Sequence, residues 1–409
     1  MENLKKIFGG DIRQLTMVFA LVALLIGFHI TSGGRMLTSS NVQNLISGNA
    51  YVLILAIGMV MVIVIGQIDL SVGSVAGLVG MTAAMSISEL GFPWWLGMIA
   101  GLALGAVIGA WHGFWLSKVG IPGFITTLAG MMIFRGAVIW MSGSISVPVP
   151  SEFSVFGSGY LPEWGPAFTQ MNNSTLVLGL IGIGWYAWSQ WRSHSHLVQT
   201  SAEAPPLWPV IVRIAAGAVV LGYITWLFGS GRPGTSFPIP GLILMVLVII
   251  YHVLTQRTPF GRSIYAVGGN RAAAALSGVK TQRTYFLVML NMSVLAALAG
   301  ILFVGRSTAA GPSDGTSWEL DAIAAVFIGG AAVSGGIGTV VGSMVGGLVM
   351  AVLNSGLSLM GIGADRTQVI KGLVLLAAVA FDVYSKRQGK QSLFSRFSKK
   401  KDEPAKAAA

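Results

Sequence analysis

The sequence comprises 409 residues, of which 54% are hydrophobic and only 10% are charged, and it contains no cysteine. Soluble domains average about 25% charged residues, so the composition excludes an ordinary soluble protein, and the missing cysteines exclude disulfide scaffolds and thiol chemistry. The net charge of +11 does not indicate nucleic-acid binding, because the basic clusters flank apolar segments and lack interleaved aromatic residues.

Apolar runs of membrane-spanning length recur along most of the chain. They are continuous rather than alternating, which is typical of transmembrane helices and not of barrel strands. We therefore predict an all-α fold, a polytopic transmembrane helical bundle of about 10–12 membrane segments. The predicted segments are 14–30, 49–67, 70–88, 95–117, 124–142, 174–191, 210–228, 239–255, 285–305, 319–333, 337–357 and 367–384.

The distribution of basic residues predicts the topology. With the N-terminus inside and the side alternating at each segment, inward parts carry 19 of the 25 Lys and Arg residues and outward parts four. Cytoplasmic loops retain Lys and Arg, so both termini are expected in the cytoplasm. The N-terminus then covers 1–13, the transmembrane domain 14–384 and a basic cytoplasmic tail 385–409. The segment 141–173 has no Lys or Arg and is expected to form an ordered outside loop. Ten membrane crossings would give the same distribution of Lys and Arg as twelve if one tight hairpin were re-entrant.

The first conspicuous acid is Asp69, in GQIDLSVGS at 66–74. A carboxylate at the bilayer centre costs about 2.5–3.5 kcal/mol. We expect Asp69 or Ser71 to cap the following helix at the membrane surface, while a gate role, or a contact with a sugar or cation, stays open.

Arg135 lies near the middle of the segment 124–142, where a charge also needs a reason. It could pair with an acid, bind the end of a neighbouring helix or line a hydrated cavity. The sequence leaves a structural ion pair and a role in the pathway equally open.

Glycines recur every four residues in two of the apolar segments, and small residues at that spacing allow helices to pack closely. They are Gly97, Gly101, Gly105, Gly109 and Gly113, and then Gly338, Gly342 and Gly346. The residues 66–77 also weakly resemble 334–342, and related halves of a transporter often meet at its path.

The inner segment 255–284 carries five positive charges and no acid. Asn270 is a good N-cap, 271–277 favour a helix, and Gly278 suits a C-terminal cap. We expect one short helix presented between two membrane segments. Lipid headgroups would need only its charge, whereas defined caps and an Ala-rich face favour docking into a protein groove.

Glu319 and Asp321 open the segment 319–333. Thr316 and Glu319 have the spacing of a capping box, in which each side chain binds the other residue's backbone N–H. A structural role is therefore expected for these acids, with the pathway as the alternative.

Enzyme signatures are missing from the sequence. The Gly-x-Gly-x-x-Gly match at 229–234 has no βαβ unit around it, no P-loop motif exists, and His194 and His196 have no third ligand nearby. We expect no catalytic residue, no cofactor and no metal, so that the energy for any uphill transport comes from a partner.

Four stretches stand out together: GQIDLSVGS (66–74), IPGFITTLAGMMIFRG (121–136), FGRSIYAVGGNRAAAALSGV (260–279) and ELDAIAAVFIGGAAVSGGIGTVVGSMVGG (319–347). In this order they resemble the permease subunits of bacterial ABC importers for monosaccharides, the group of ribose, xylose, arabinose and galactose permeases. The likeness covers roughly 40–384. The additional apolar segments at about 174–228 are similar to those of the xylose and multiple-monosaccharide subgroup.

The resemblance implies a homodimeric, channel-forming subunit in the bacterial inner membrane, with a periplasmic sugar-binding protein outside and an ATPase of two nucleotide-binding halves inside. It implies ATPase contacts for the inner-loop residues Gly268, Gly269, Asn270, Ala273, Ala274, Ser277 and Gly278. The candidates for the pathway or gate are Asp69, Ser71, Ser74, Arg135, Glu319 and Asp321.

The expected function is thus import of a monosaccharide, powered by ATP hydrolysis in a partner subunit. A branched-chain amino-acid ABC permease is the nearest alternative. An ion-coupled sugar carrier is another, although it would need ionisable relays inside the membrane, for which only Asp69 and Arg135 are candidates. The expected partners also include membrane lipid and exclude nucleic acid.

Overall fold

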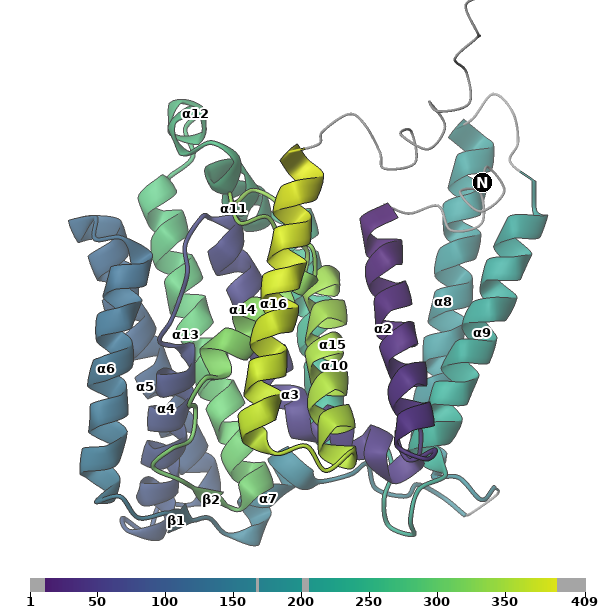
Figure 1. The fold of residues 1–409 in the computed structure, drawn as a ribbon, viewed down its shortest axis with the longest axis horizontal. Coiled ribbons are helices and arrows are strands. Elements are labelled where there is room, and N and C mark those ends of the chain that lie inside the picture. The colour runs from purple at the N-terminus through teal and green to yellow at the C-terminus, as the bar shows by residue number, and fades with distance from the viewer. Residues whose placement is uncertain (1–11, 167–168, 201–205, 388–409) are drawn as a thin grey trace, which may run out of the picture.

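The computed structural model describes residues 12–166, 169–200 and 206–387, and these form a bundle built almost entirely of helices (Figure 1). The elements in chain order are α2 (Ile12–Thr31), α3 (Ser39–Val64), α4 (Val72–Ser88), α5 (Trp94–Phe114), the π-helix η1 (Trp115–Val119), α6 (Gly123–Ser142), β1 (Val147–Pro148), α7 (Ser151–Ser158), α8 (Asn173–Thr200), α9 (Trp208–Gly229), α10 (Ile239–Arg257), α11 (Pro259–Gly269), α12 (Arg271–Leu276), α13 (Thr281–Ser307), β2 (Ala309–Ala310), α14 (Trp318–Ile328), α15 (Val340–Leu359) and α16 (Ala364–Arg387). The two short strands pair antiparallel, with Val147 opposite Ala310.

Each predicted apolar segment lies on a helix, which confirms the helical fold. Seven of the described helices are long and apolar enough to cross a membrane. They are α3, α5 with η1, α6, α9, α10, α13 and α15. The total of 10–12 membrane segments stays a prediction.

The predicted segment 319–333 is wrong at its end. α14 has 11 residues and stops at Ile328, so at about 1.5 Å per residue it covers only about half of a 30 Å hydrocarbon core. Gly330 has a φ of +84°, and a Cβ on Gly329 would lie 2.5 Å from the carbonyl oxygen of Gly342. The two glycines therefore end the helix where the chain turns against α15.

α3 begins ten residues before the predicted segment 49–67 because its first turns are polar but buried. The Gln43 amide is 2% exposed and donates to the Phe228 carbonyl oxygen at 2.8 Å, and Ser47 is also buried. A hydropathy criterion overlooks such turns, since their polar groups are satisfied by other helices.

α3 and α13 form the centre of the bundle. Residues 52–65 are buried without interruption, and α13 packs against α3, α4 and α5. A Cβ on Gly105 of α5 would lie 2.5 Å from the Ala297 Cβ, and one on Gly346 of α15 would lie 2.0 Å from the Ala325 carbonyl oxygen. The predicted close packing along both glycine stripes is confirmed.

Apolar side chains cover much of the outer surface. Trp140 of α6 is 84% exposed and Val219 of α9 is 72% exposed. α8 and α9 form a hairpin at one edge of the bundle (Figure 1), packed closely where Gly217 meets the ring of Tyr186. Apolar surface of this extent is typical of contact with lipid.

The two ends of the bundle differ (Figure 1). α12 projects at one end, and α2 begins and α16 ends at that same end. β1, β2 and α7 lie at the opposite end. The 141–173 loop is ordered over its described residues, as expected, because β1 pairs with β2 and Phe153 of α7 is fully buried.

Candidate functional site

α12 is the short helix predicted in the 255–284 segment. The Asn270 Oδ1 atom accepts the N–H of Ala273 at 3.0 Å, so Asn270 is the N-cap. At the other end Gly278 has a φ of +84°, and the Val279 N–H donates to the Ala274 carbonyl oxygen at 3.0 Å, as in a Schellman motif. Both predicted caps are confirmed.

α12 projects as a rigid knob beyond the bundle (Figure 1). Ala273 and Ser277 are exposed while Ala274 faces inward. Leu276 is 91% exposed, the most of any large hydrophobic residue in the described chain. The knob therefore presents apolar surface outside the membrane-spanning part of the bundle.

Gly268 and Gly269 lie outside α12, at the end of α11, where they fasten the knob to the bundle. A Cβ on Gly268 would lie 1.7 Å from the carbonyl oxygen of Val64, and Gly269 touches Gly336. The Gly336 N–H donates to the same Val64 oxygen at 2.8 Å. The sequence-predicted coupling residues thus divide into a tip and a base.

Two side chains strengthen this attachment. The Tyr265 hydroxyl donates to the Gly338 carbonyl oxygen at 2.7 Å and accepts from Gln256 at 3.2 Å. Burial raises the pKa of the Tyr265 phenol and the bond from Gln256 lowers it, with the net shift upward, so the hydroxyl stays a donor. The Arg271 guanidinium lies 5.1 Å from the ring centroid of Tyr285, a cation–π contact between α12 and α13.

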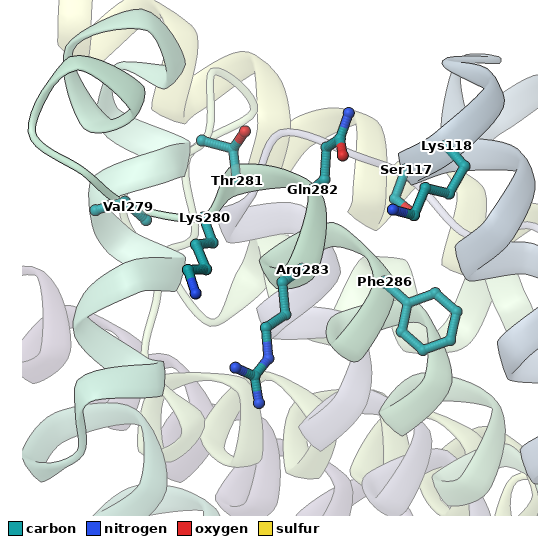
Figure 2. A pocket seen from close by; sticks show the side chains of 8 residues that line it. All are labelled: Ser117, Lys118, Val279, Lys280, Thr281, Gln282, Arg283 and Phe286. Atoms are coloured by element: carbon teal, nitrogen blue, oxygen red, sulfur yellow. The ribbon is translucent and has the colours of Figure 1, made fainter.

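A basic hollow of about 620 Å³ lies beside the base of α12 (Figure 2). Lys118 of η1 faces it from one side, and Lys280 and Arg283 extend from the start of α13 on the other. No acid lines it, and in the described chain these three cations have no ion-pair partner. The end of the bundle that carries α12 therefore attracts anions.

Two irregular segments interrupt the helices inside the bundle. The segment 65–71 joins α3 to α4, and 329–339 joins α14 to α15. α11 contacts Val64, the last residue of α3 before the first segment, and Gly336 in the second segment, while Gly335 lies against Gly66 of the first. Each segment overlaps one of the two weakly similar stretches, 66–77 and 334–342.

Asp69 lies in the first irregular segment and is fully buried inside the protein, and the predicted capping of α4 by its side chain is wrong, because the N-cap is Ser71 and no side chain caps the helix. The Asp69 Oδ1 atom accepts the backbone N–H of Ser71 at 2.8 Å and the Ser71 hydroxyl at 2.6 Å. Ser71 does not cap α4 with its side chain, because its hydroxyl is bound to Asp69. Ser74 is buried and donates to the Ser71 carbonyl oxygen at 2.8 Å.

α6 holds the same segment from the side. The Gly123 N–H donates to the Gln67 amide oxygen at 2.8 Å, and the Thr127 hydroxyl accepts the Leu70 N–H at 3.0 Å. Sequence reasoning gave no role to Thr127, because its partner Leu70 lies 57 residues away.

The predicted capping box at α14 is wrong. The N-cap is Ser317, with a φ of +66° and no side-chain cap. The Thr316 hydroxyl instead accepts a hydrogen bond from the Arg135 guanidinium. The Glu319 Oε2 atom is buried without a hydrogen-bond partner in the described chain, and a Cβ on Gly73 would lie 2.5 Å from it.

Arg135 therefore binds the segment that precedes a neighbouring helix, one of the three possibilities left open by the sequence. Its second Nη atom donates to the Gly315 carbonyl oxygen at 3.2 Å. Arg135 makes no ion pair among the described residues, although its charge acts on Glu319.

Buried polar atoms without partners in the described chain lie in the 65–71 segment, on α5 and on α14. The Asp69 Oδ2 atom, the Glu319 Oε2 atom and both ring nitrogens of His112 are buried without hydrogen-bond partners in the described chain. The charge of Asp69 acts on both Glu319 and His112. Sequence reasoning overlooked His112, which stands among the α5 glycines without a motif of its own.

Asp321 differs from Glu319 because it has an ionic partner. The Lys371 ammonium on α16 lies 2.9 Å and 3.0 Å from its two carboxylate oxygens. The structure thus brings Asp321 to α16 and leaves Glu319 facing α4.

Comparisons with known proteins agree over nearly the whole chain. A family model described as "Branched-chain amino acid transport system / permease component" matches residues 41–379. The xylose transport system permease protein XylH of Escherichia coli K12 is 37% identical over 379 residues, which cover 92% of this chain and 93% of that protein. XylH of Haemophilus influenzae is 35% identical over 94% of this chain and 99% of its own. The ribose import permease protein RbsC of Escherichia coli K12 is 32% identical over 89% of this chain and 92% of its own. No solved structure matches significantly.

Proposed function

The chain belongs to the family of permease components described for branched-chain amino acid transport systems, and we propose that it is the membrane subunit of an ATP-driven importer of a monosaccharide. The observation that carries the proposal is similarity to xylose and ribose permeases over about nine-tenths of both chains. The chain is accordingly a multi-pass permease of a bacterial ABC importer and is not itself catalytic. It works with a separate ATPase and with a binding protein that delivers the sugar.

α12 is the docking element for the ATPase. Asn270, Ala273, Ala274, Ser277 and Gly278 build and cap the knob, and Gly268 with Gly269 forms its base. Lipid headgroups would explain the nearby cations, but they offer no apolar groove for the exposed Leu276 side chain. Protein docking accounts for both features.

Movement of α12 is transmitted through α11 to the sugar path inside the bundle. Because α11 touches Val64 and Gly336, a shift of α12 on ATPase closure displaces both irregular segments. A partner can bias the inward- and outward-facing states only by binding them differently. Asp69, Ser71, Ser74, Arg135 and Glu319 line or hold these segments and form the gate.

The proposed topology places α12 in the cytoplasm. The described ends of α2 and α16 lie at the same end of the bundle (Figure 1), which supports cytoplasmic termini together with the bias of Lys and Arg. β1, β2 and α7 then face the periplasm and the binding protein. Counting α2, α4, α8 and α16 besides the seven apolar spans gives eleven segments. The passage from β2 through the short helix α14 to the start of α15 adds a twelfth crossing, the even number that termini on one side require.

Two copies of the chain form the complete path. An ATPase with two nucleotide-binding halves offers two grooves, one for the α12 knob of each copy. Mass measurement of the purified complex tests this stoichiometry, which two permease chains per ATPase of two halves would support and a single permease chain would contradict.

Uptake into proteoliposomes tests the function. The permease is reconstituted with its ATPase and binding protein, and uptake of d-xylose, d-ribose and L-leucine is measured. ATP-dependent uptake of either sugar is expected. Uptake of L-leucine alone would favour the amino-acid alternative, and uptake driven by an ion gradient without ATP would favour a secondary carrier.

A further inference from the structure

A second hollow, of about 600 Å³, lies between α3, α14, α15 and α16, near the α14 start. The residues of α16 that line it lie within 364–375, the half of that helix farther from α12, since α16 begins at the end of the bundle opposite α12 (Figure 1). Sites for small ligands commonly have volumes of about 300–1,000 Å³, so this hollow is large enough for a monosaccharide.

One wall of the hollow is aromatic. The Trp318 ring lies 4.2 Å from the Tyr51 ring and 4.5 Å from the Phe303 ring, measured between centroids. Trp318 and Tyr51 line the hollow, while Phe303 backs them. The Tyr51 hydroxyl has no hydrogen-bond partner among the described residues and lies within range of the Asp321 charge. Trp318 is 8% exposed, so the wall offers a small apolar aromatic area with a free hydroxyl beside it.

The ion pair of Asp321 and Lys371 also lines the hollow, and the two side chains are 12% and 20% exposed. Asn354 and Asn49 also line the hollow, with an amide–amide bond of 3.3 Å. A carboxylate accepts hydrogen bonds and an ammonium donates three. The lining therefore offers both hydrogen-bond donors and hydrogen-bond acceptors, and its net charge is zero. Such a lining suits a neutral polyhydroxyl ligand better than an ion.

The same lining excludes a lipid-facing role. An ion pair with two amides would be costly against hydrocarbon, so the hollow faces protein or water, not lipid chains, in the assembled transporter. A ligand bound there would touch α14, which continues into the irregular segment 329–339 at its other end.

We propose that this hollow is a transient sugar-binding site on the import path, where Asp321 and Lys371 bind hydroxyl groups and Trp318 and Tyr51 face the apolar side of the sugar ring. The inference rests on the proposed function and adds to it the place where the permease itself contacts the sugar.

A charge swap separates sugar binding from a purely structural ion pair. Asp321→Asn and Lys371→Gln are each expected to lower ATP-driven uptake of the transported pentose about tenfold, the effect of ~1.4 kcal/mol. The double variant Asp321→Lys with Lys371→Asp re-forms the pair and restores the melting temperature, but uptake stays low. Recovery of both uptake and melting temperature in the swap, or full uptake in both single variants, would overturn the proposal.

Single-cysteine labelling gives a second readout, because the chain has no cysteine of its own. Gln368→Cys places a thiol at the hollow, and Ser151→Cys places one on exposed α7 at the same end as a matched control. With the full transporter, saturating d-xylose or d-ribose is expected to slow maleimide labelling at residue 368 at least about fivefold, while the rate at 151 is unchanged. Equal rates at 368 with and without a sugar that the unmodified transporter imports would refute the site alone. If the unmodified transporter imports neither sugar, the proposed function fails first.

Discussion

Leu276 offers the sharpest test of the docking knob, since its side chain is 91% exposed on a helix that both caps hold rigid. Burying a leucine in a groove is worth about 1.5–3 kcal/mol. Leu276→Asp removes this gain and adds a carboxylate that must lose its water, so the ATPase dissociation constant is expected to rise by about 10- to 150-fold. The stability of the permease should change by less than about 0.5 kcal/mol, because the side chain contacts little in the free chain.

The assay measures binding of the purified ATPase to the permease in nanodiscs, with the melting temperature of each variant alongside. Leu90→Asp is the matched control, since Leu90 is 69% exposed and lies between α4 and α5, at the end away from α12. It should leave ATPase affinity unchanged. A dissociation constant for Leu276→Asp within twofold of the unmodified value would refute the docking assignment.

Three further predictions concern the caps, the helix packing and the gate. Asn270→Ala removes the N-cap of α12 at a cost of about 1 kcal/mol, and Gly278→Val forces a valine into a φ of +84°. Both variants should insert into the membrane but lower the sugar-stimulated rate of ATP hydrolysis. An undiminished rate would argue against the docking role of α12. Gly105→Ala should destabilise by about 1–3 kcal/mol, because its Cβ would lie 2.5 Å from a side chain of α13. The matched variant Gly136→Ala should not destabilise the protein, because a Cβ there would have no neighbour within 4 Å. Equal melting temperatures for the two variants would contradict the close packing at Gly105. Arg135→Gln loses charge-assisted bonds worth about 1.5–3 kcal/mol and should lower both the melting temperature and uptake, so an unchanged melting temperature would count against its role in holding the start of α14.

Local rules predicted the features that depend on neighbouring residues. Asn270 and Gly278 act within one turn of α12, so spacing alone identified both caps. The α5 and α15 glycine stripes were equally readable, because a small residue every fourth position makes a groove whatever packs against it.

Features that depend on distant residues could not be predicted. Asp321 pairs with Lys371, fifty positions away, and Thr316 binds Arg135 rather than Glu319. At Thr316 the tertiary partner outcompeted the local cap that the sequence suggested. Hydropathy likewise overlooked the first turns of α3, where Gln43 is buried yet satisfied by α9.

The most direct test of the account is to measure ATP hydrolysis and sugar uptake together in liposomes that hold the permease and its ATPase. Adding the sugar-loaded binding protein outside should accelerate hydrolysis, and withdrawing ATP should stop uptake. Uptake that continues without ATP, or hydrolysis that does not respond to the loaded binding protein, would contradict a permease whose movement is driven through α12.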